Sequence, residues 1–353
     1  MGERNGAVNL WDTETQEVHG GQTWRLCEEF VEDFSVTTNP LGPPDSAMDL
    51  VKEVLPEILH YPAADCGEAL TALSKFIKFP KDQLLIGNGA SEFIDLIMRA
   101  GPPGPFKPGP YVAAYMEYNR AATAADREIL PFDSPEDAGI TVIIHPNSPT
   151  GDCMSLEDIE KEIERTKGMI VLDESFIANY GPNWHEVSGL RLIEKYPEQL
   201  AVICSWTKLW ACPGLRLGSI AIGAAWYNRL KKLQTPWSCS VLAQAFCTAA
   251  ASDTEYMERT WNDVHEWKSR QTELVKSLGW KIHPGCVDWV PYIFVDCFDE
   301  AEAEKASDVA QAAGCPVRLC ASFGTPTYLR LGVRRPEKQD VLFQAWRKAF
   351  AAQ

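Results

Sequence analysis

Short apolar runs alternate along this chain with longer segments in which apolar residues recur at helical spacing. Runs of the first kind predict buried strands, and the amphipathic segments between them predict helices. Strands are expected at Leu84–Ile86, Gly168–Leu172, Leu200–Cys204, Tyr292–Cys297 and Tyr328–Val333. Helices are expected from near Ser46 to just before Tyr61, at Glu68–Ile77, Phe93–Met98, Leu156–Arg165, Ala225–Leu233, Glu255–Leu278 and Ala301–Ala313, and from Pro336 onward. This alternation predicts an α/β protein built from βαβ units around a largely parallel sheet.

The order of these segments predicts three parts. Residues 1–45 form an N-terminal arm that contributes to the active site and to the small domain. Residues 46–252 form a large domain, and residues 253–353 form a small C-terminal domain, reached through the long helix near Glu255 to Leu278. A chain of 353 residues with 45% hydrophobic content is long enough for two such cores.

Charge and cysteine content narrow the class of protein. The chain has 33 basic and 49 acidic residues, a net charge of −16, which argues against nucleic acid or anionic membranes as partners. Its 11 cysteines contain no CxxC pair, so we expect neither a disulfide framework nor a bound metal. No secretory signal or membrane-spanning run is evident. The composition therefore predicts a cytoplasmic enzyme.

An acid and a lysine follow two of the predicted strands. Asp173 follows the apolar run that begins at Gly168, and Lys208 lies four residues beyond Leu200–Cys204. Ligands in open α/β sheets bind at the carboxyl ends of strands, so we expect Asp173 and Lys208 to face one crevice. A lysine amine placed there can form a Schiff base with an aldehyde. Taken singly, the lysine is typical of an exposed loop and the acid of a turn cap; together they predict a cofactor site.

Donors suited to a phosphate group lie near both residues in the sequence. A glycine-containing segment precedes the helix expected at Phe93, and amides at a helix start bind anions. The expected phosphate donors are Gly89, Ala90, Ser91, Ser205, Thr207 and Arg216. A lysine for an aldehyde, an acid for a ring nitrogen and donors for a phosphate are what pyridoxal 5′-phosphate (PLP) requires of a protein. Asp173 would keep the pyridine nitrogen protonated, and Lys208 would shuttle a proton.

The order of these motifs resembles fold-type I PLP enzymes of the class I/II aminotransferase group over nearly the whole chain. Within that group, the chain is most similar to the branch of histidinol-phosphate aminotransferase and threonine-phosphate decarboxylase. The matching segments are His19-Gly20-Gly21, Asp33-Phe34-Ser35, Asn39-Pro40-Leu41-Gly42, Tyr61-Pro62, Gly87-Asn88-Gly89, Pro149-Thr150-Gly151, Asp173-Glu174, Thr207-Lys208, Pro213-Gly214-Leu215-Arg216 and Pro236-Trp237-Ser238. The resemblance implies a large domain with a mostly parallel sheet wrapped by helices, and a smaller α/β C-terminal domain.

The resemblance also implies roles for residues that spacing alone does not reveal. Tyr118 would stack on the pyridine ring, with Tyr115 as the alternative. Arg330 would hold the substrate carboxylate, its planar fork gripping both carboxylate oxygens, with Arg334 in reserve. His19 and Asn39 would line the substrate pocket. Tyr61 would reach the cofactor phosphate of a partner subunit, which implies a homodimer with shared active sites.

Two positions depart from the family pattern, and both would lie near the phenolic oxygen of the cofactor ring. Ser148 stands where the family has an asparagine before Pro-Thr-Gly, and Asn147 is the neighbour that can substitute for it. Phe176 replaces a tyrosine that aminotransferases often use, and phenylalanine there resembles the decarboxylase sub-branch. Fewer donors to an anionic oxygen change the electrostatics of the ring.

These observations predict an aminotransferase that acts on a small amino acid or amine with a phosphate or other anionic tail. A decarboxylase of the same fold is the main alternative, because the two reactions differ only in which Cα bond stands perpendicular to the ring. A non-catalytic PLP-binding protein is a third hypothesis, since fold does not fix function. A nicotinamide-dependent dehydrogenase is set aside, because the glycines near Gly87 lack the full G-x-G-x-x-G pattern.

Overall fold

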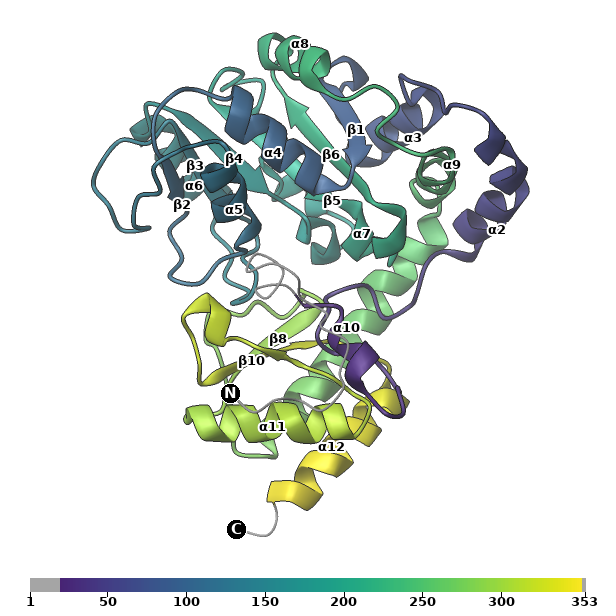
Figure 1. Ribbon diagram of the computed structural model, residues 1–353, viewed down its shortest axis with the longest axis vertical. Coiled ribbons are helices and arrows are strands. Elements are labelled where there is room, and N and C mark those ends of the chain that lie inside the picture. Colours follow the sequence, from purple (N-terminus) through teal and green to yellow (C-terminus); the bar gives the residue numbers. More distant parts are fainter. Residues whose placement is uncertain (1–19, 351–353) are drawn as a thin grey trace. The chain divides into compact units, whose positions relative to one another are not determined.

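The computed structural model describes residues 20–350 and divides them into two compact units (Figure 1). The larger unit holds residues 38–265 and 287–291, and the smaller holds 266–286, the described residues before 38 and those after 291. The sequence suggested borders at 45/46 and 252/253. The long helix α10 (Thr254–Lys276) explains part of this difference, because Tyr256 in its first turn donates a hydrogen bond to the Leu209 carbonyl of the larger unit, at 3.0 Å.

A six-stranded sheet forms the centre of the larger unit, in the order β1-β6-β5-β4-β3-β2. Its strands are β1 (Leu84–Asn88), β2 (Phe106–Pro108), β3 (Ile140–Ile144), β4 (Met169–Asp173), β5 (Leu200–Ser205) and β6 (Leu217–Ile222). The pairs β2–β3, β3–β4 and β4–β5 are parallel, whereas β6 runs antiparallel to both of its neighbours. The prediction of an α/β fold with a mostly parallel sheet is confirmed.

Helices cover this sheet because its strands are apolar on both faces. Every residue of β3, β4 and β6 is buried, which is the pattern expected when neither face meets water. On one face, α4 (Ala90–Ala100) and α5 (Glu117–Ala124) pack against strand residues such as Val142 and Ile203 (Figure 1). Each fully buried aliphatic or aromatic side chain of this kind contributes about 1.5–3 kcal/mol through the hydrophobic effect.

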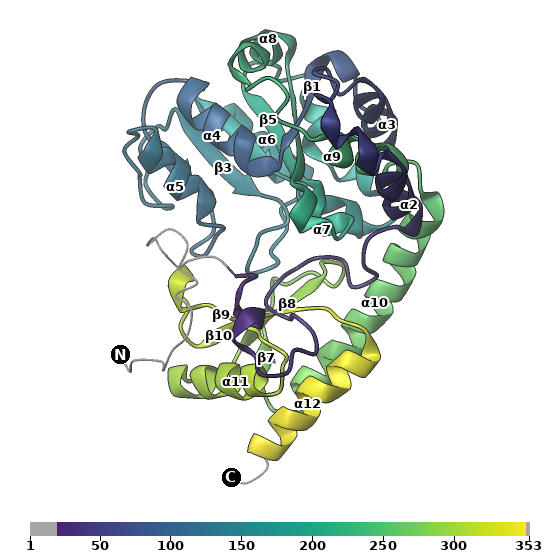
Figure 2. The ribbon, with the colours of Figure 1, turned by 45° about the vertical axis from the view of Figure 1, so that its right-hand side comes forward.

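The larger unit contains six further α-helices between residues 45 and 250. They are α2 (Asp45–Val54), α3 (Gly67–Ile77), α6 (Leu156–Arg165), α7 (Trp206–Leu209), α8 (Ala224–Leu233) and α9 (Val241–Ala250). Helices α2, α3 and α9 lie side by side (Figures 1 and 2). The helix expected to continue almost to Tyr61 ends at Val54 and gives way to a 3-10 turn, Leu55–Leu59, in which Pro56 cannot supply the amide that an α-helix needs.

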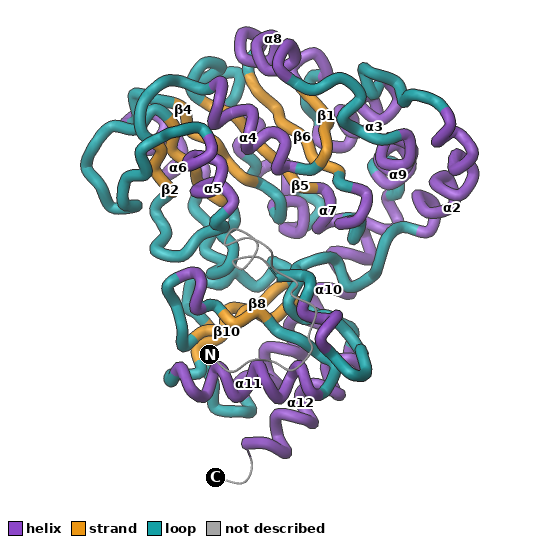
Figure 3. Tube along the Cα trace, in the orientation of Figure 1, coloured by secondary structure: helices purple, strands orange, loops and turns teal. Residues whose placement is uncertain are grey.

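A four-stranded antiparallel sheet forms the smaller unit, in the order β7-β8-β10-β9 (Figure 3). Its strands are β7 (Lys281–Ile282), β8 (Tyr292–Asp296), β9 (Arg318–Leu319) and β10 (Tyr328–Gly332). Helices α11 (Glu300–Ala312) and α12 (Pro336–Phe350) supply alanines and large apolar residues to one core with this sheet. The N-terminal segment joins the unit through Phe34, whose carbonyl accepts a hydrogen bond from the Gly332 amide at 2.8 Å. Within residues 20–350, no helix combines the length and apolarity needed to cross a bilayer.

Candidate active site

Lys208 lies on a four-residue helix that begins directly after a central strand. This helix, α7, follows Ser205, the last residue of β5. Two buried tryptophans hold this helix in place. The ring centroids of Trp206 and Trp210 are 5.1 Å apart in a stacked arrangement, and Phe76 packs against both rings. Lys208 itself is half-buried, and its Nζ lies 3.3 Å from Thr207 Oγ1. The fold therefore holds the lysine at the carboxyl edge of the sheet, where the sequence predicted a ligand site.

Asn39 forms hydrogen bonds that hold helix α7 in place. Its backbone amide donates to the Lys208 carbonyl at 2.9 Å, and its side-chain Nδ2 donates to the Leu209 carbonyl at 3.0 Å and to Thr260 Oγ1 at 2.8 Å. Its Oδ1 accepts from the Leu41 amide at 3.0 Å. Asn39 was predicted to contact substrate, but these hydrogen bonds and its 4% exposure give it a supporting role beneath Lys208.

Asp173 ends strand β4 beside β5, and several donors surround its carboxylate. Oδ1 accepts from the amide and hydroxyl of Ser175, at 3.1 and 2.6 Å, and Oδ2 accepts from the phenol of Tyr118 at 2.9 Å. Burial raises the pKa of Asp173, while Ser175, Tyr118 and the positive charge of Lys208 oppose that rise. The predicted acid and lysine are therefore within electrostatic reach of each other: Asp173 ends β4, and Lys208 lies on α7, directly after the parallel neighbour β5.

Glu174, the next residue, occupies a different environment from Asp173. Successive residues at the end of a strand face opposite sides, and the Glu174 carboxylate lies in a small pocket lined by Trp184 and Trp206. It accepts from Ser188 Oγ at 2.5 Å and from the Gly189 amide at 2.6 Å. Burial raises the pKa of Glu174 to about 7. Of this acid pair, only Asp173 shares the neighbourhood of Lys208.

The turn between β1 and α4 forms a cradle of the kind that binds phosphate. Gly89 adopts φ 76°, and a side chain there would bring Cβ to 2.6 Å from Arg216 Nη2. Gly218 on β6 lies so close to this turn that a Cβ would sit 2.2 Å from the Ala90 nitrogen. Helix α4, with 11 residues, begins at Ala90 and directs its first amides toward this turn. Ser91 Oγ lies 3.4 Å from Arg216 Nη2 and completes the arrangement.

Hydroxyl and guanidinium groups from β5, α7 and the following turn adjoin the cradle. Ser205 Oγ and Thr207 Oγ1 are 2.7 Å apart. Arg216 is exposed and takes the left-handed conformation at φ 57°, a strained backbone of the kind found at ligand sites. Among the described residues, no carboxylate lies within 4.0 Å of its guanidinium. An exposed cation without an acidic partner, beside a helix N-terminus, is suited to an anion.

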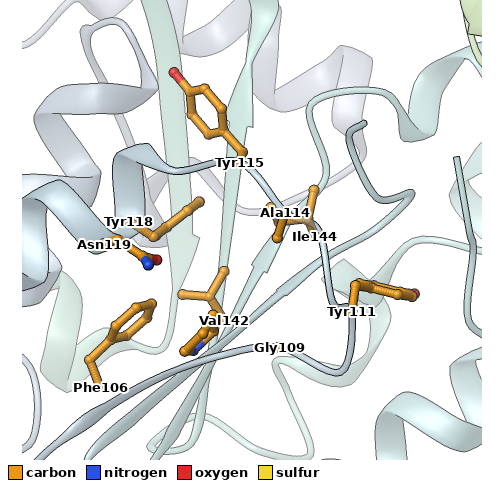
Figure 4. A pocket seen from close by; sticks show the side chains of 10 residues that line it. Phe106, Gly109, Tyr111, Ala114, Tyr115, Tyr118, Asn119, Val142 and Ile144 are labelled. Carbon is orange, nitrogen blue, oxygen red and sulfur yellow. The ribbon is translucent and has the colours of Figure 1, made fainter. Parts of the chain in front are cut away.

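The structure changes the assignment of the stacking aromatic residue. Tyr118 was predicted to stack on the cofactor ring, but its ring is 1% exposed and belongs to the core between α5 and the sheet. Phe106 and Val142 belong to the same buried cluster and lie near the Tyr118 ring (Figure 4). Tyr115, which was the alternative, is 37% exposed and points away from that cluster (Figure 4). Tyr115 is therefore the better candidate for ring stacking.

The two positions that depart from the family pattern are both buried. Asn147 donates from Nδ2 to the Ala113 carbonyl at 2.8 Å and to Thr150 Oγ1 at 2.7 Å. Ser148 and Phe176 are 6% and 4% exposed. Phe176 brings no hydroxyl to its surroundings; that this removes a donor to the cofactor ring stays a prediction. His19, predicted to reach the substrate, lies outside the described residues.

Two arginines face each other in the smaller unit. Arg330 on β10 pairs directly with Arg318 on β9. Arg330 Nη2 donates to the Ser35 carbonyl at 2.9 Å, and Arg318 Nη2 donates to Ser322 Oγ at 2.7 Å. Burial and the charge of Arg330 lower the pKa of Arg318 to about 10. Like charges held opposite each other in a partly buried place favour binding of an anion between or beside them.

The sequence interpretation did not include Arg318, and it named Arg334 as the reserve residue for carboxylate binding. Arg318 lies 12 residues before Arg330, and only the β9–β10 pairing shows that the two are neighbours. Arg334, the reserve for carboxylate binding, is 3% exposed and donates to the carbonyls of Asp33 and Val36. These bonds tie the N-terminal segment to the smaller unit and leave Arg334 a structural role.

Comparison with known proteins identifies the family. A model of the family described as aminotransferase class I and II matches residues 31–345. The chain belongs to this family. Its members depend on PLP, and this aminotransferase-family enzyme uses the same cofactor.

Individual relatives place the enzyme near one branch of the family. It is 27% identical over 344 residues to histidinol-phosphate aminotransferase of Methanosarcina mazei, covering 92% of this chain and 89% of the relative. It is 28% identical over 262 residues to a putative threonine-phosphate decarboxylase of Caldanaerobacter subterraneus subsp. tengcongensis, covering 69% of each chain. The fold matches histidinol-phosphate aminotransferase from Sinorhizobium meliloti in complex with PLP, with TM-score 0.83, 16% identity and coverage of 98% and 99% of the two chains.

The residues present fit PLP. The cradle at Gly89 has the donors and the bare backbone that a phosphate needs, and side chains there would close it. Asp173 is a buried carboxylate held by three donors, which suits a pyridine nitrogen. Lys208 lies on α7, directly after the strand that pairs with that of Asp173, and this half-buried lysine has its Nζ 3.3 Å from Thr207 Oγ1. The three requirements of the cofactor are thus met within one unit of the chain.

Proposed function

We propose that this enzyme is an aminotransferase of small amino acids or amines that carry a phosphate or other anionic tail. The observation that carries the proposal is the pair Arg318 and Arg330, held opposite each other on β9 and β10. One guanidinium suits the substrate carboxylate, and the second suits an anionic tail. The identities near 25% to histidinol-phosphate aminotransferases agree with such a substrate.

The proposal assigns a task to each site residue. When bound, PLP supplies an electron-withdrawing ring that weakens the bonds at the substrate Cα. Lys208 is the attachment point of the cofactor and moves the Cα proton. Asp173 would hold the proton on the pyridine nitrogen, and Tyr115 would pack on the ring. Gly89, Ala90, Ser91, Ser205, Thr207 and Arg216 would bind the phosphate, and Asn147 and Ser148 would serve the ring oxygen.

A decarboxylase is the second candidate, because one observation favours it. Phe176 is buried at the position where aminotransferases often have a tyrosine, so that donor to the ring oxygen is missing. Similarity to a putative threonine-phosphate decarboxylase points the same way. In this alternative, the same arginines hold the substrate so that the bond to the carboxylate, rather than the bond to hydrogen, stands perpendicular to the ring.

One assay separates the reactions. The purified holoenzyme is incubated with phosphorylated amino acids and with amino-alcohol phosphates, each with and without 2-oxoglutarate, while CO2, glutamate and keto products are measured. We expect glutamate to form only when the acceptor is present. Release of CO2 in proportion to substrate without an acceptor would establish the decarboxylase instead. Absence of any turnover across the panel would favour a binding protein.

We further propose that the enzyme is a homodimer in which Tyr61 of each chain reaches the other active site. Tyr61 is 83% exposed, and its ring lies 4.9 Å from that of Trp237, itself 50% exposed. Leu59 beside them is 84% exposed, which is unfavourable in water unless another surface covers it. Light scattering of the holoenzyme should give twice the chain mass of 39.3 kDa, and Leu59→Glu should reduce it toward the monomer. A monomeric, fully active wild type would contradict this proposal.

A further inference from the structure

The phenol of Tyr118 forms a buried hydrogen bond with Asp173. The role predicted from the sequence, stacking on the cofactor ring, does not account for this bond. The phenol donates to Asp173 Oδ2 at 2.9 Å, across 55 positions of sequence, from helix α5 to the end of β4. Both side chains are buried, at 1% and 5% exposure. A hydrogen bond to a buried carboxylate is stronger than one in water, because no solvent competes for it. The bond therefore connects helix α5 directly to the acid of the candidate site.

We propose that Tyr118 is a positioning residue, whose phenol fixes the rotation of the Asp173 carboxylate and keeps it ionised for the pyridine nitrogen of the cofactor. This inference rests on the proposed role of Asp173. Ser175 holds Oδ1 through two hydrogen bonds, and Tyr118 holds Oδ2. With both oxygens bound, the carboxylate cannot rotate freely. The carboxylate of Asp173 therefore keeps one orientation, which these hydrogen bonds set.

The surroundings explain why such support is needed. Burial alone would favour the neutral acid, and it raises the pKa of Asp173. The other ionisable groups around Asp173 and Tyr118 are Glu174 next in sequence, Cys204 on β5, Lys208 on α7 and Tyr115 before α5. Of these, only Lys208 favours the charged carboxylate. Tyr118 adds a neutral donor, which stabilises the negative charge without a counterion that would compete with the cofactor.

Tyr118→Phe tests the inference because it removes the hydroxyl and keeps the ring. Loss of the donor raises the pKa of Asp173, so the ionised form is lost at higher pH as the solution is acidified. We expect the acid limb of the kcat/KM profile to move upward by about one pH unit. The dissociation constant of PLP from the apoenzyme, measured by fluorescence titration, should rise about tenfold at pH 6. KM for the amino substrate should change far less than kcat.

Tyr196→Phe is the matched control. The Tyr196 hydroxyl also lies within hydrogen-bonding distance of carboxylates, 2.7 Å from Glu164 and 3.1 Å from Glu160, but these are on α6, away from the candidate site. This variant should keep the wild-type pH profile and PLP affinity. An equal shift in both variants would overturn the inference, because it would reflect general destabilisation.

A double-mutant cycle shows whether Tyr118 acts through Asp173. In an Asp173→Asn background, which has no titrating carboxylate, Tyr118→Phe should leave PLP affinity and the pH profile unchanged. A full additional effect in that background would overturn the inference. Failure of Asp173→Asn itself to weaken PLP would instead contradict the proposed function, so the two failures are distinguishable.

A second substitution covers the case in which Tyr118→Phe does not fold. A fluorinated tyrosine at position 118 keeps the shape of the ring and donates a stronger hydrogen bond. The acid limb should then move to lower pH, opposite to the effect of Tyr118→Phe. An unchanged limb with the fluorinated residue would overturn the inference.

Discussion

Lys208→Ala should abolish the visible absorbance band of the lysine-linked cofactor and reduce kcat by about 10³-fold or more. The lysine has two tasks in the proposed function, as the covalent attachment point of the cofactor and as the group that moves the Cα proton. Alanine can perform neither. The phosphate cradle around Gly89 and Arg216 stays intact in this variant, so we expect PLP still to bind, without its covalent link, and to be lost on gel filtration.

A matched control separates this effect from loss of a surface charge. Lys52→Ala removes a lysine whose side chain is 70% exposed and paired only with Asp49 on the same helix. It should leave absorbance and turnover at wild-type values, because an exposed pair of this kind contributes little. Circular dichroism should show that both variants are folded. Normal turnover by Lys208→Ala would remove the basis of the proposed function.

Arg330→Ala should lower kcat/KM for an amino-acid substrate by about 100-fold, which corresponds to roughly 3 kcal/mol of lost interaction. In the proposed function the planar guanidinium would hold the carboxylate through two parallel hydrogen bonds, and alanine would leave that charge without a partner. Because the carboxylate also fixes which Cα bond faces the ring, part of the loss should appear in kcat. For an amine substrate without a carboxylate, the same substitution should have a much smaller effect.

Two further arginine variants define the specificity of this result. Arg318→Ala should weaken binding of substrates with an anionic tail more than that of substrates without one. Arg335→Ala is the charge control, because its guanidinium is exposed and lies 6.0 Å from the ring of Trp267. It should leave kcat/KM unchanged. Equal losses for substrates with and without a carboxylate in Arg330→Ala would contradict the proposed role.

Local patterns in the sequence predicted the elements that carry the site. The apolar run ending at Asp173 and the one preceding Lys208 are strands β4 and β5, because fully buried parallel strands are apolar at every position. A helix was predicted near Leu156 to Arg165, and α6 has these ends; in the structure Ser155 caps its first turn by accepting from the Asp158 amide. Signals of this kind depend on neighbouring residues only.

Other features depended on contacts between distant segments. Nothing near Asn39 in sequence shows that its amide fastens the carbonyl groups of Lys208 and Leu209. The spacing of Tyr115 and Tyr118 did not reveal which ring stays open, since both are aromatic and only packing of α5 on the sheet buries one of them. Such outcomes are decided by tertiary packing, which a local pattern does not record.

The sequence by itself determined the α/β class and the family resemblance, and it predicted the cofactor residues. It could do so because the lysine and the acid follow strand ends in the sequence, and the phosphate turn precedes a helix. Only the tertiary structure decided the neighbours of these groups: that Tyr118 donates to Asp173, and that Arg318 lies opposite Arg330. The physical reason is the same in both cases. Residues far apart in the chain meet only when helices pack on a sheet and strands align in register, and those contacts set the charge and orientation of each functional group.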